Sequence, residues 1–97
     1  MSSSNLNVQM HQLEKLIQDT KMYVSSLKNN RIVQTPQVLA GEALRSGLSR
    51  ETFDRYISYC DVLNEQVSQN ISVYMEKLCI PFLERVLEQM QKACSLK

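Results

Sequence analysis

The side chains that could carry out chemistry are few in this chain of 97 residues, and their spacing matches no familiar site. His11 is the only histidine, and the three cysteines stand at positions 60, 79 and 94. Steps of 19 and 15 residues between cysteines fit neither a zinc motif nor a redox motif, and one histidine cannot close a metal site without further ligands. We therefore expect no metal and no cofactor. We interpret the cysteines as small apolar packing residues, with a functional thiol as the alternative.

Catalytic groups are equally hard to assemble. A serine or cysteine nucleophile would need His11 as its base, yet His11 falls beside the apolar stripe of a predicted amphipathic helix, where no pocket would exclude water. Neither glycine, Gly41 or Gly47, belongs to a phosphate-binding loop. The acidic residues stand beside arginines at the spacing of solvated helix faces. We predict no catalytic residue, no small-molecule substrate and no enzymatic activity.

The charge pattern argues against nucleic-acid and membrane surfaces. Eleven basic and ten acidic residues leave a formal charge of +1, and no two basic residues are adjacent. The longest uncharged stretch near the C-terminus, Leu78 to Leu83, is far shorter than the ~20 residues of a membrane span. The serine-rich start lacks the pattern of a secretory signal, and unpaired cysteines fit a reducing compartment. We expect an intracellular protein, cytoplasmic or nuclear.

Most of the chain shows helical periodicity, which predicts the elements that would position any functional site. Apolar residues recur at alternating steps of four and three from Leu6 to Leu27 and again from Phe53 to Leu78, which is coiled-coil spacing. Thr35 followed by Pro36 is typical of a helix start, and Gly47 of a helix end. We predict one all-α domain over residues 1–97, with helices at about 5–28, 36–46, 49–80 and 82–95.

The helix predicted for 49–80 carries the longest apolar stripe. Its inward positions would be Phe53, Ile57, Cys60, Asn64, Val67, Ile71, Tyr74 and Leu78. Asn64 would either fix the register as a buried amide or lie in water while Leu63 takes the inward position. Tyr56 and Tyr59 are predicted to flank this stripe with their hydroxyls toward water.

Pro81 interrupts that pattern. Proline removes a backbone donor and its ring crowds the preceding helical turn, and the apolar stripe that resumes after it is offset from the earlier register. We therefore expect a helical hairpin or small bundle with coiled-coil-like packing, in which a long C-terminal helix is kinked near Pro81.

The predicted helix lengths suggest that a partner is needed. The first helix would span about 36 Å, whereas Ser49 to Lys97 would span about 73 Å if helical throughout. The segment after Pro81 would lack an internal partner unless it folded back at Pro81 to complete a four-helix bundle. We predict that another chain, self or foreign, covers its apolar side chains. These are Ile80, Phe82, Leu83, Val86, Leu87 and Met90.

The leading hypothesis is therefore a non-enzymatic helical interaction subunit of a larger multiprotein assembly. It would act as a scaffold or adaptor and bind partner helices by forming a coiled coil or completing a bundle. One alternative is a self-contained four-helix bundle that binds an apolar ligand or a peptide in its core. A homo-oligomeric scaffold is the other.

Overall fold

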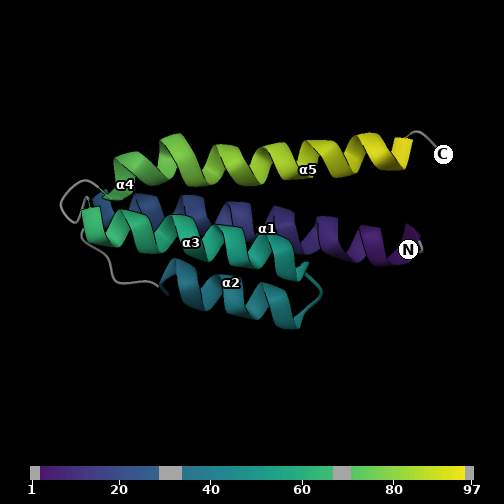
Figure 1. Cartoon of the computed structure of the whole chain (residues 1–97), viewed down its shortest axis with the longest axis horizontal. Helices are drawn as coiled ribbons and strands as arrows, with labels where there is room; N and C mark the ends of the chain where they lie inside the picture. The colour runs from purple at the N-terminus through teal and green to yellow at the C-terminus, as the bar shows by residue number, and fades with distance from the viewer. Residues whose placement is uncertain (1–2, 29–33, 67–70, 96–97) are drawn as a thin grey trace.

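The computed structural model describes residues 3–28, 34–66 and 71–95, and all regular structure in these ranges is helical. The elements are α1 (Ser3–Lys28), α2 (Pro36–Arg45), α3 (Arg50–Gln66), α4 (Ile71–Tyr74), the π-helical segment η1 (Met75–Cys79) and α5 (Ile80–Ser95). Since α4, η1 and α5 follow one another directly, they form one long C-terminal helical run (Figure 1). The prediction of a small all-α bundle with a long C-terminal helix is confirmed.

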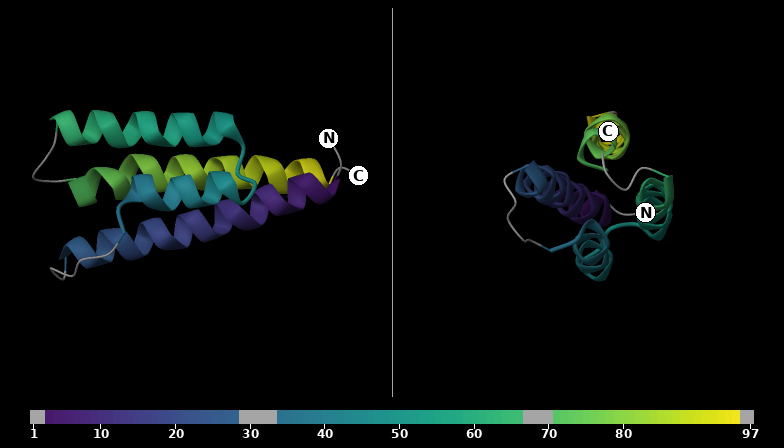
Figure 2. Two further views of the ribbon diagram at one scale, coloured as in Figure 1. Left: turned by 90° about the horizontal axis from the view of Figure 1, so that it is seen from below. Right: turned by 90° about the vertical axis from the view of Figure 1, so that its left-hand side faces the viewer.

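The helices are packed as an elongated bundle, with principal extents of 44 × 20 × 20 Å. Successive helices run in opposite directions, so that α1 and α5 are antiparallel and both chain ends lie at the same end of the molecule (Figures 1 and 2). Helix α1 contacts both α2 and α5, and α2 packs against α3. The chain therefore supplies its own cover for α5.

Local signals set the ends of α2 as predicted. The Thr35 hydroxyl accepts a backbone N–H three residues further on, at 3.4 Å, and Pro36 is the first helical residue. Gly47 has a φ of 125°, a conformation that side chains with a Cβ disfavour. It lets the Leu48 N–H turn back to the Ala43 carbonyl at 2.9 Å, which satisfies a carbonyl that the helix end would leave unpaired.

The prediction of one helix over 49–80 is wrong. Helix α3 ends at Gln66, α4 begins at Ile71, and the chain direction is reversed between them (Figure 1). The stretch from residue 64 to 70 contains a single apolar side chain among polar ones, so a continuous helix would gain little burial there. The side chains of Asn64 and Val67 lie outside the described residues.

The reversal also changes which residues of the C-terminal run face inward. Tyr74 and Leu78, expected to be inward, are exposed, while Met75 and Cys79 are buried in their place. The irregularity expected near Pro81 takes the form of η1, in which the Ile80 N–H reaches the carbonyl of Met75, five residues back. A wider turn relieves the crowding that the proline ring would cause in a regular α-helix. The chain does not fold back at Pro81.

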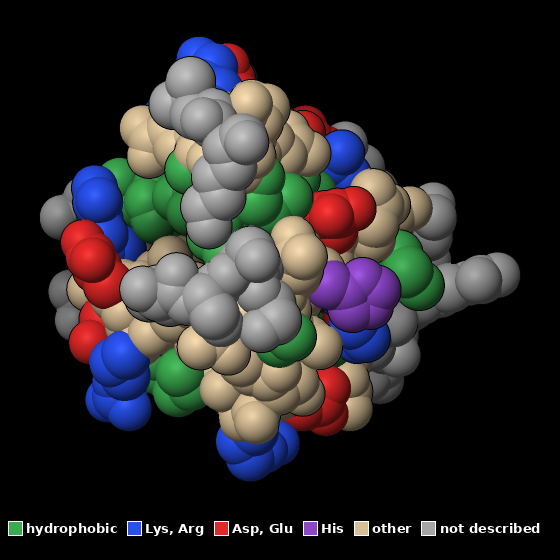
Figure 3. All heavy atoms as spheres, turned by 90° about the vertical axis from the view of Figure 1, so that its right-hand side faces the viewer, with side chains coloured by type: hydrophobic (Ala, Val, Ile, Leu, Met, Phe, Trp, Pro, Cys, Tyr) green, Lys and Arg blue, Asp and Glu red, His purple; other side chains and the backbone are tan. Residues whose placement is uncertain are grey.

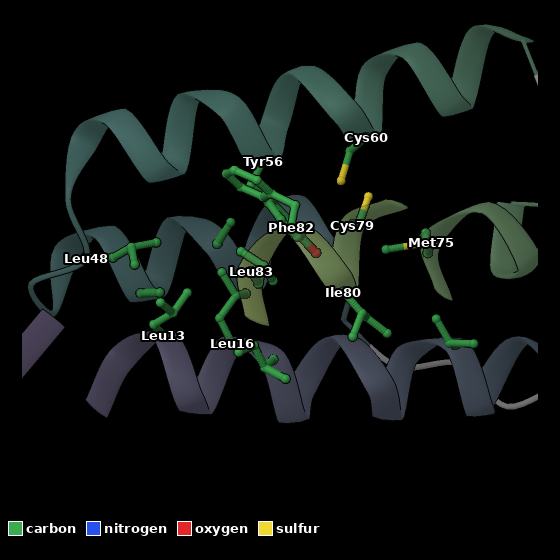
Figure 4. Close-up of a cluster of buried hydrophobic side chains, with 14 residues drawn as sticks. Leu13, Leu16, Leu48, Tyr56, Cys60, Met75, Cys79, Ile80, Phe82 and Leu83 are labelled. Carbon is green, nitrogen blue, oxygen red and sulfur yellow. The ribbon is translucent and has the colours of Figure 1, made fainter. Parts of the chain in front are cut away.

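The core lies where α1, α3, η1 and α5 meet, with α2 and Leu48, in the connection between α2 and α3, closing one side (Figure 4). Its buried apolar members are Leu13, Leu16, Ile17, Val24, Ala40, Ala43, Leu48, Tyr56, Cys60, Met75, Cys79, Ile80, Phe82 and Leu83. Phe82 also receives the edge of Tyr59, with ring centroids 5.2 Å apart, and the Arg55 guanidinium lies 5.1 Å from its centroid.

Candidate functional site

The residues predicted to face a partner all lie on α5. Ile80, Phe82 and Leu83 are only 7%, 4% and 0% exposed, because the reversal between α3 and α4 lays α5 along α1. Val86, Leu87 and Met90 are partly buried and pack against the same core. The expectation that another chain must cover this segment therefore needs correction: its first three anchors are covered within the chain itself.

The far end of α5 differs from its beginning, because α1 and α5 extend past the other two helices. Helix α1 has 26 residues and α3 has 17, a difference of about 13 Å in length. Where α2 and α3 stop short, only α1 and α5 lie side by side (Figures 1 and 2). We call this part the open end of the bundle.

Apolar side chains from both helices line the open end. We define it by Leu6, Val8, Met10, Met90 and Cys94. Val8 is 46% exposed and lies at the border of this end, beside Gly47 in the connection from α2 to α3, and the other four are partly buried. The Cys94 sulfur lies 3.6 Å from the sulfur of Met10, which ties the end of α5 to the start of α1. Viewed onto this end, the molecule shows hydrophobic side chains among polar ones (Figure 3).

Charges around the open end are mixed in sign. Glu88 and Lys92 form an exposed ion pair one turn apart on α5, at 3.2 Å. His11 on α1 is exposed to solvent. An ion pair of this kind contributes little to stability. Among the described residues, this end therefore combines partly exposed apolar side chains with charges of both signs, which suits a helix better than a polyanion.

Hollows that could take a ligand lie along α1, some between α1 and α2 and others between α1 and the C-terminal helical run. Two of them, each of about 320 Å³, share Asp19 and Leu39 in their walls. The first also has Lys15, Glu42 and Arg45 in its wall. The wall of the first hollow carries charges of both signs and does not resemble a pocket for an apolar ligand.

A buried pair of hydroxyls joins α1 to α3. Thr20 and Tyr56 are both 0% exposed, and their oxygens lie 3.0 Å apart at hydrogen-bonding distance. The prediction that the Tyr56 hydroxyl faces water is wrong, because Thr20, the one polar member of the α1 stripe, supplies a partner inside the core. Burial raises the pKa of Tyr56 well above its ordinary value of 10.0.

Next to this pair, the fold brings two cysteines together. Cys60 of α3 and Cys79 at the end of η1 are both buried, and their sulfur atoms point toward each other (Figure 4). The neighbouring thiol of Cys79, together with burial, raises the pKa of Cys60, whereas the neighbouring thiol of Cys60 lowers the pKa of Cys79. Their separation of 19 residues gave no sign of this contact, since only the reversal of the chain creates it.

Two further observations concern the described residues only. They contain no group of three or more His, Cys, Asp or Glu side chains that could hold a metal ion. None of their helices combines the length and the apolar character that crossing a membrane requires. Comparison of the chain with protein-family models, with curated proteins and with solved structures found no match.

Proposed function

We propose that this protein is a non-enzymatic helical interaction subunit, which binds a helix of a partner chain by bundle completion at the open end. The observation that carries the proposal is the difference in helix length: α1 and α5 form a two-helix extension where α2 and α3 do not reach. Two adjacent helices with half-exposed apolar side chains offer the groove into which a third helix packs.

The burial of individual side chains favours the open end over the beginning of α5 as the partner-binding surface. Ile80, Phe82 and Leu83 are already buried and have nothing left to contribute to a partner. Val8 and Met90 still expose apolar surface, and covering such a half-exposed side chain contributes about 1 kcal/mol. A partner helix must therefore contact most of the open end to offset the cost of association.

Charge reversal at the open end tests the proposal. The variant Val8→Glu with Met90→Lys places two charged side chains at positions that are not fully buried, so the bundle should stay folded. The matched control, Val38→Glu with Met22→Lys, makes the same exchanges on the α1–α2 face, where these residues are 48% and 63% exposed. Far-ultraviolet circular dichroism should show nearly unchanged helix content in both variants.

Binding is then compared by quantitative co-purification from the source cells and by sedimentation velocity over a hundredfold range of concentration. We expect a partner chain, or a second copy, that is lost from the open-end variant and retained by the control. Loss by roughly tenfold or more in affinity would fit the removal of central anchors. Equal retention by both variants, or loss from the control alone, would refute binding at the open end.

Sedimentation also separates the proposal from the homo-oligomeric scaffold. In two copies, the open ends could pair to make a four-helix arrangement, because each contributes two helices and no strong charge of one sign. A mass that doubles with concentration, and does so only when Val8 and Met90 are intact, would identify the second copy as the partner. If the mass stays that of a monomer at all concentrations, and a different chain co-purifies with the protein but not with the open-end variant, the assembly is a hetero-complex.

A further inference from the structure

The two buried cysteines stand on separate helices that the chain reversal places side by side. Cys60 lies one turn after Tyr56 on α3, and Cys79 is the last residue of η1. Their side chains point at each other across the contact between the two elements (Figure 4), and both are buried. The structure thus pairs two sulfurs inside the core without any metal-ligand cluster around them among the described residues.

We propose that Cys60 and Cys79 form a reversible intramolecular disulfide when the protein meets a small disulfide oxidant such as oxidised glutathione. The thiolate of Cys79 attacks one sulfur of the oxidant, which gives a mixed disulfide and releases one glutathione thiolate. Cys60 then loses its proton and attacks the Cys79 sulfur, which releases the second glutathione. Two protein thiols are oxidised and one glutathione disulfide is reduced to two thiols.

The arrangement favours this pair over any other. Cys94 follows Cys79 by 15 residues along the same helical run, a distance of about 22 Å, so it cannot reach Cys79 within one chain. It contacts Met10 at the open end instead. The neighbouring Cys60 thiol lowers the pKa of Cys79 and so favours its thiolate, the form that attacks a disulfide.

Because both cysteines are buried, the reaction must start with a local opening of the fold. Cys60 and Cys79 are 2% and 0% exposed, so the oxidant must wait for α3 and η1 to separate locally. Oxidation should therefore be slow in native buffer and faster in mild urea. Once formed, the bond would close a loop that contains the reversal, and it should raise the melting temperature by several degrees.

The test uses the full chain with Cys94→Ser, so that only the buried pair remains. The protein is incubated with oxidised glutathione in native buffer, and a second sample is refolded from urea in a glutathione redox buffer. We expect intact mass to fall by two hydrogens in the refolded sample, peptide mapping to link Cys60 with Cys79, and a reductant to reverse both changes. In the control with Cys79→Ser as well, Cys60 should carry one glutathione and form no link.

Two outcomes would overturn the proposal. One is a refolded sample that keeps two free thiols, or carries two separate glutathione adducts, at a redox potential that oxidises ordinary structural dithiols. The other is a linked form that melts below the reduced protein, because the disulfide would then fit only a disturbed fold. The result is independent of partner binding at the open end, which involves neither cysteine.

Discussion

Removing both hydroxyls of the buried Thr20–Tyr56 pair should destabilise the protein by less than the sum of the two single removals. The two groups are fully buried and 3.0 Å apart, and a buried hydroxyl left without a partner costs about 1–3 kcal/mol. Thr20→Val removes the hydrogen-bond partner of the buried Tyr56 hydroxyl, so we expect a loss of about 2 kcal/mol. Tyr56→Phe leaves the Thr20 hydroxyl, which can turn to the carbonyl of Leu16 one turn back, so about 1 kcal/mol is expected.

The double variant removes both polar groups and should cost about 1 kcal/mol, which gives a coupling energy of about 2 kcal/mol between the two sites. Urea unfolding followed by circular dichroism measures each free energy of unfolding, and the dependence on urea should be unchanged. Ser58→Ala is the control, since the exposed Ser58 hydroxyl bonds only the Asp54 carbonyl, and its cost should stay below about 0.5 kcal/mol. Single costs that simply add in the double variant would refute the coupling.

Two further predictions follow from the backbone of Gly47 and from the burial of Tyr56. Gly47→Ala should lower the free energy of unfolding by about 1–3 kcal/mol, because φ is 125° and a new Cβ would lie 2.6 Å from Val8. Gly41→Ala inside α2 adds a Cβ that meets no atom within 4 Å, so it should raise the free energy of unfolding by about 0.5–1 kcal/mol. Equal effects of the two exchanges on urea unfolding would contradict this. Because the pKa of Tyr56 is raised, the folded state keeps a proton that the unfolded state loses above pH 10, so stability should be full below that pH and fall by about 1.4 kcal/mol per unit above it. In Tyr56→Phe the slope should be smaller by that amount, and an unchanged slope would rule out this tyrosine as its source.

Features with a local cause could be predicted from the sequence. The start of α2 depends on Thr35 and Pro36, and its end depends on Gly47, all within a few residues of the boundary. The four-three spacing from Leu6 to Leu27 also predicted the inward face of α1, because a helix repeats its face every three to four residues: Ile17, Thr20 and Val24 are buried, although Leu27 at the end of the stripe is exposed. These properties need no knowledge of what packs on the helix.

The reversal after α3 could not be predicted in this way. Val67 and Ile71 continue the four-three spacing from α3 into α4, so the periodicity indicates one helix although the chain turns back between them. Whether the chain turns depends on the free energy gained when α5 packs along α1. That free energy comes from contacts between residues some sixty positions apart in the sequence. The exposure of Tyr74 and Leu78 has the same origin, since their face lost its continuity with α3.

Because of the same reversal, the surface that we propose for partner binding lies nearer the C-terminal end of α5 than the sequence predicted. A straight helix would have left all six predicted residues without cover, whereas α5 antiparallel to α1 matches a helix of 26 residues with a run from Ile71 to Ser95 of nearly equal length. Helices α2 and α3 are shorter than α1 and than the C-terminal run, so they do not cover the full length of that pair. Apolar side chains of α1 and α5 are accordingly left partly exposed where those two helices end, and Met90 is the member of the predicted set that lies there. A partner helix is thus expected to replace the missing lengths of α2 and α3, and to leave the buried start of α5 untouched.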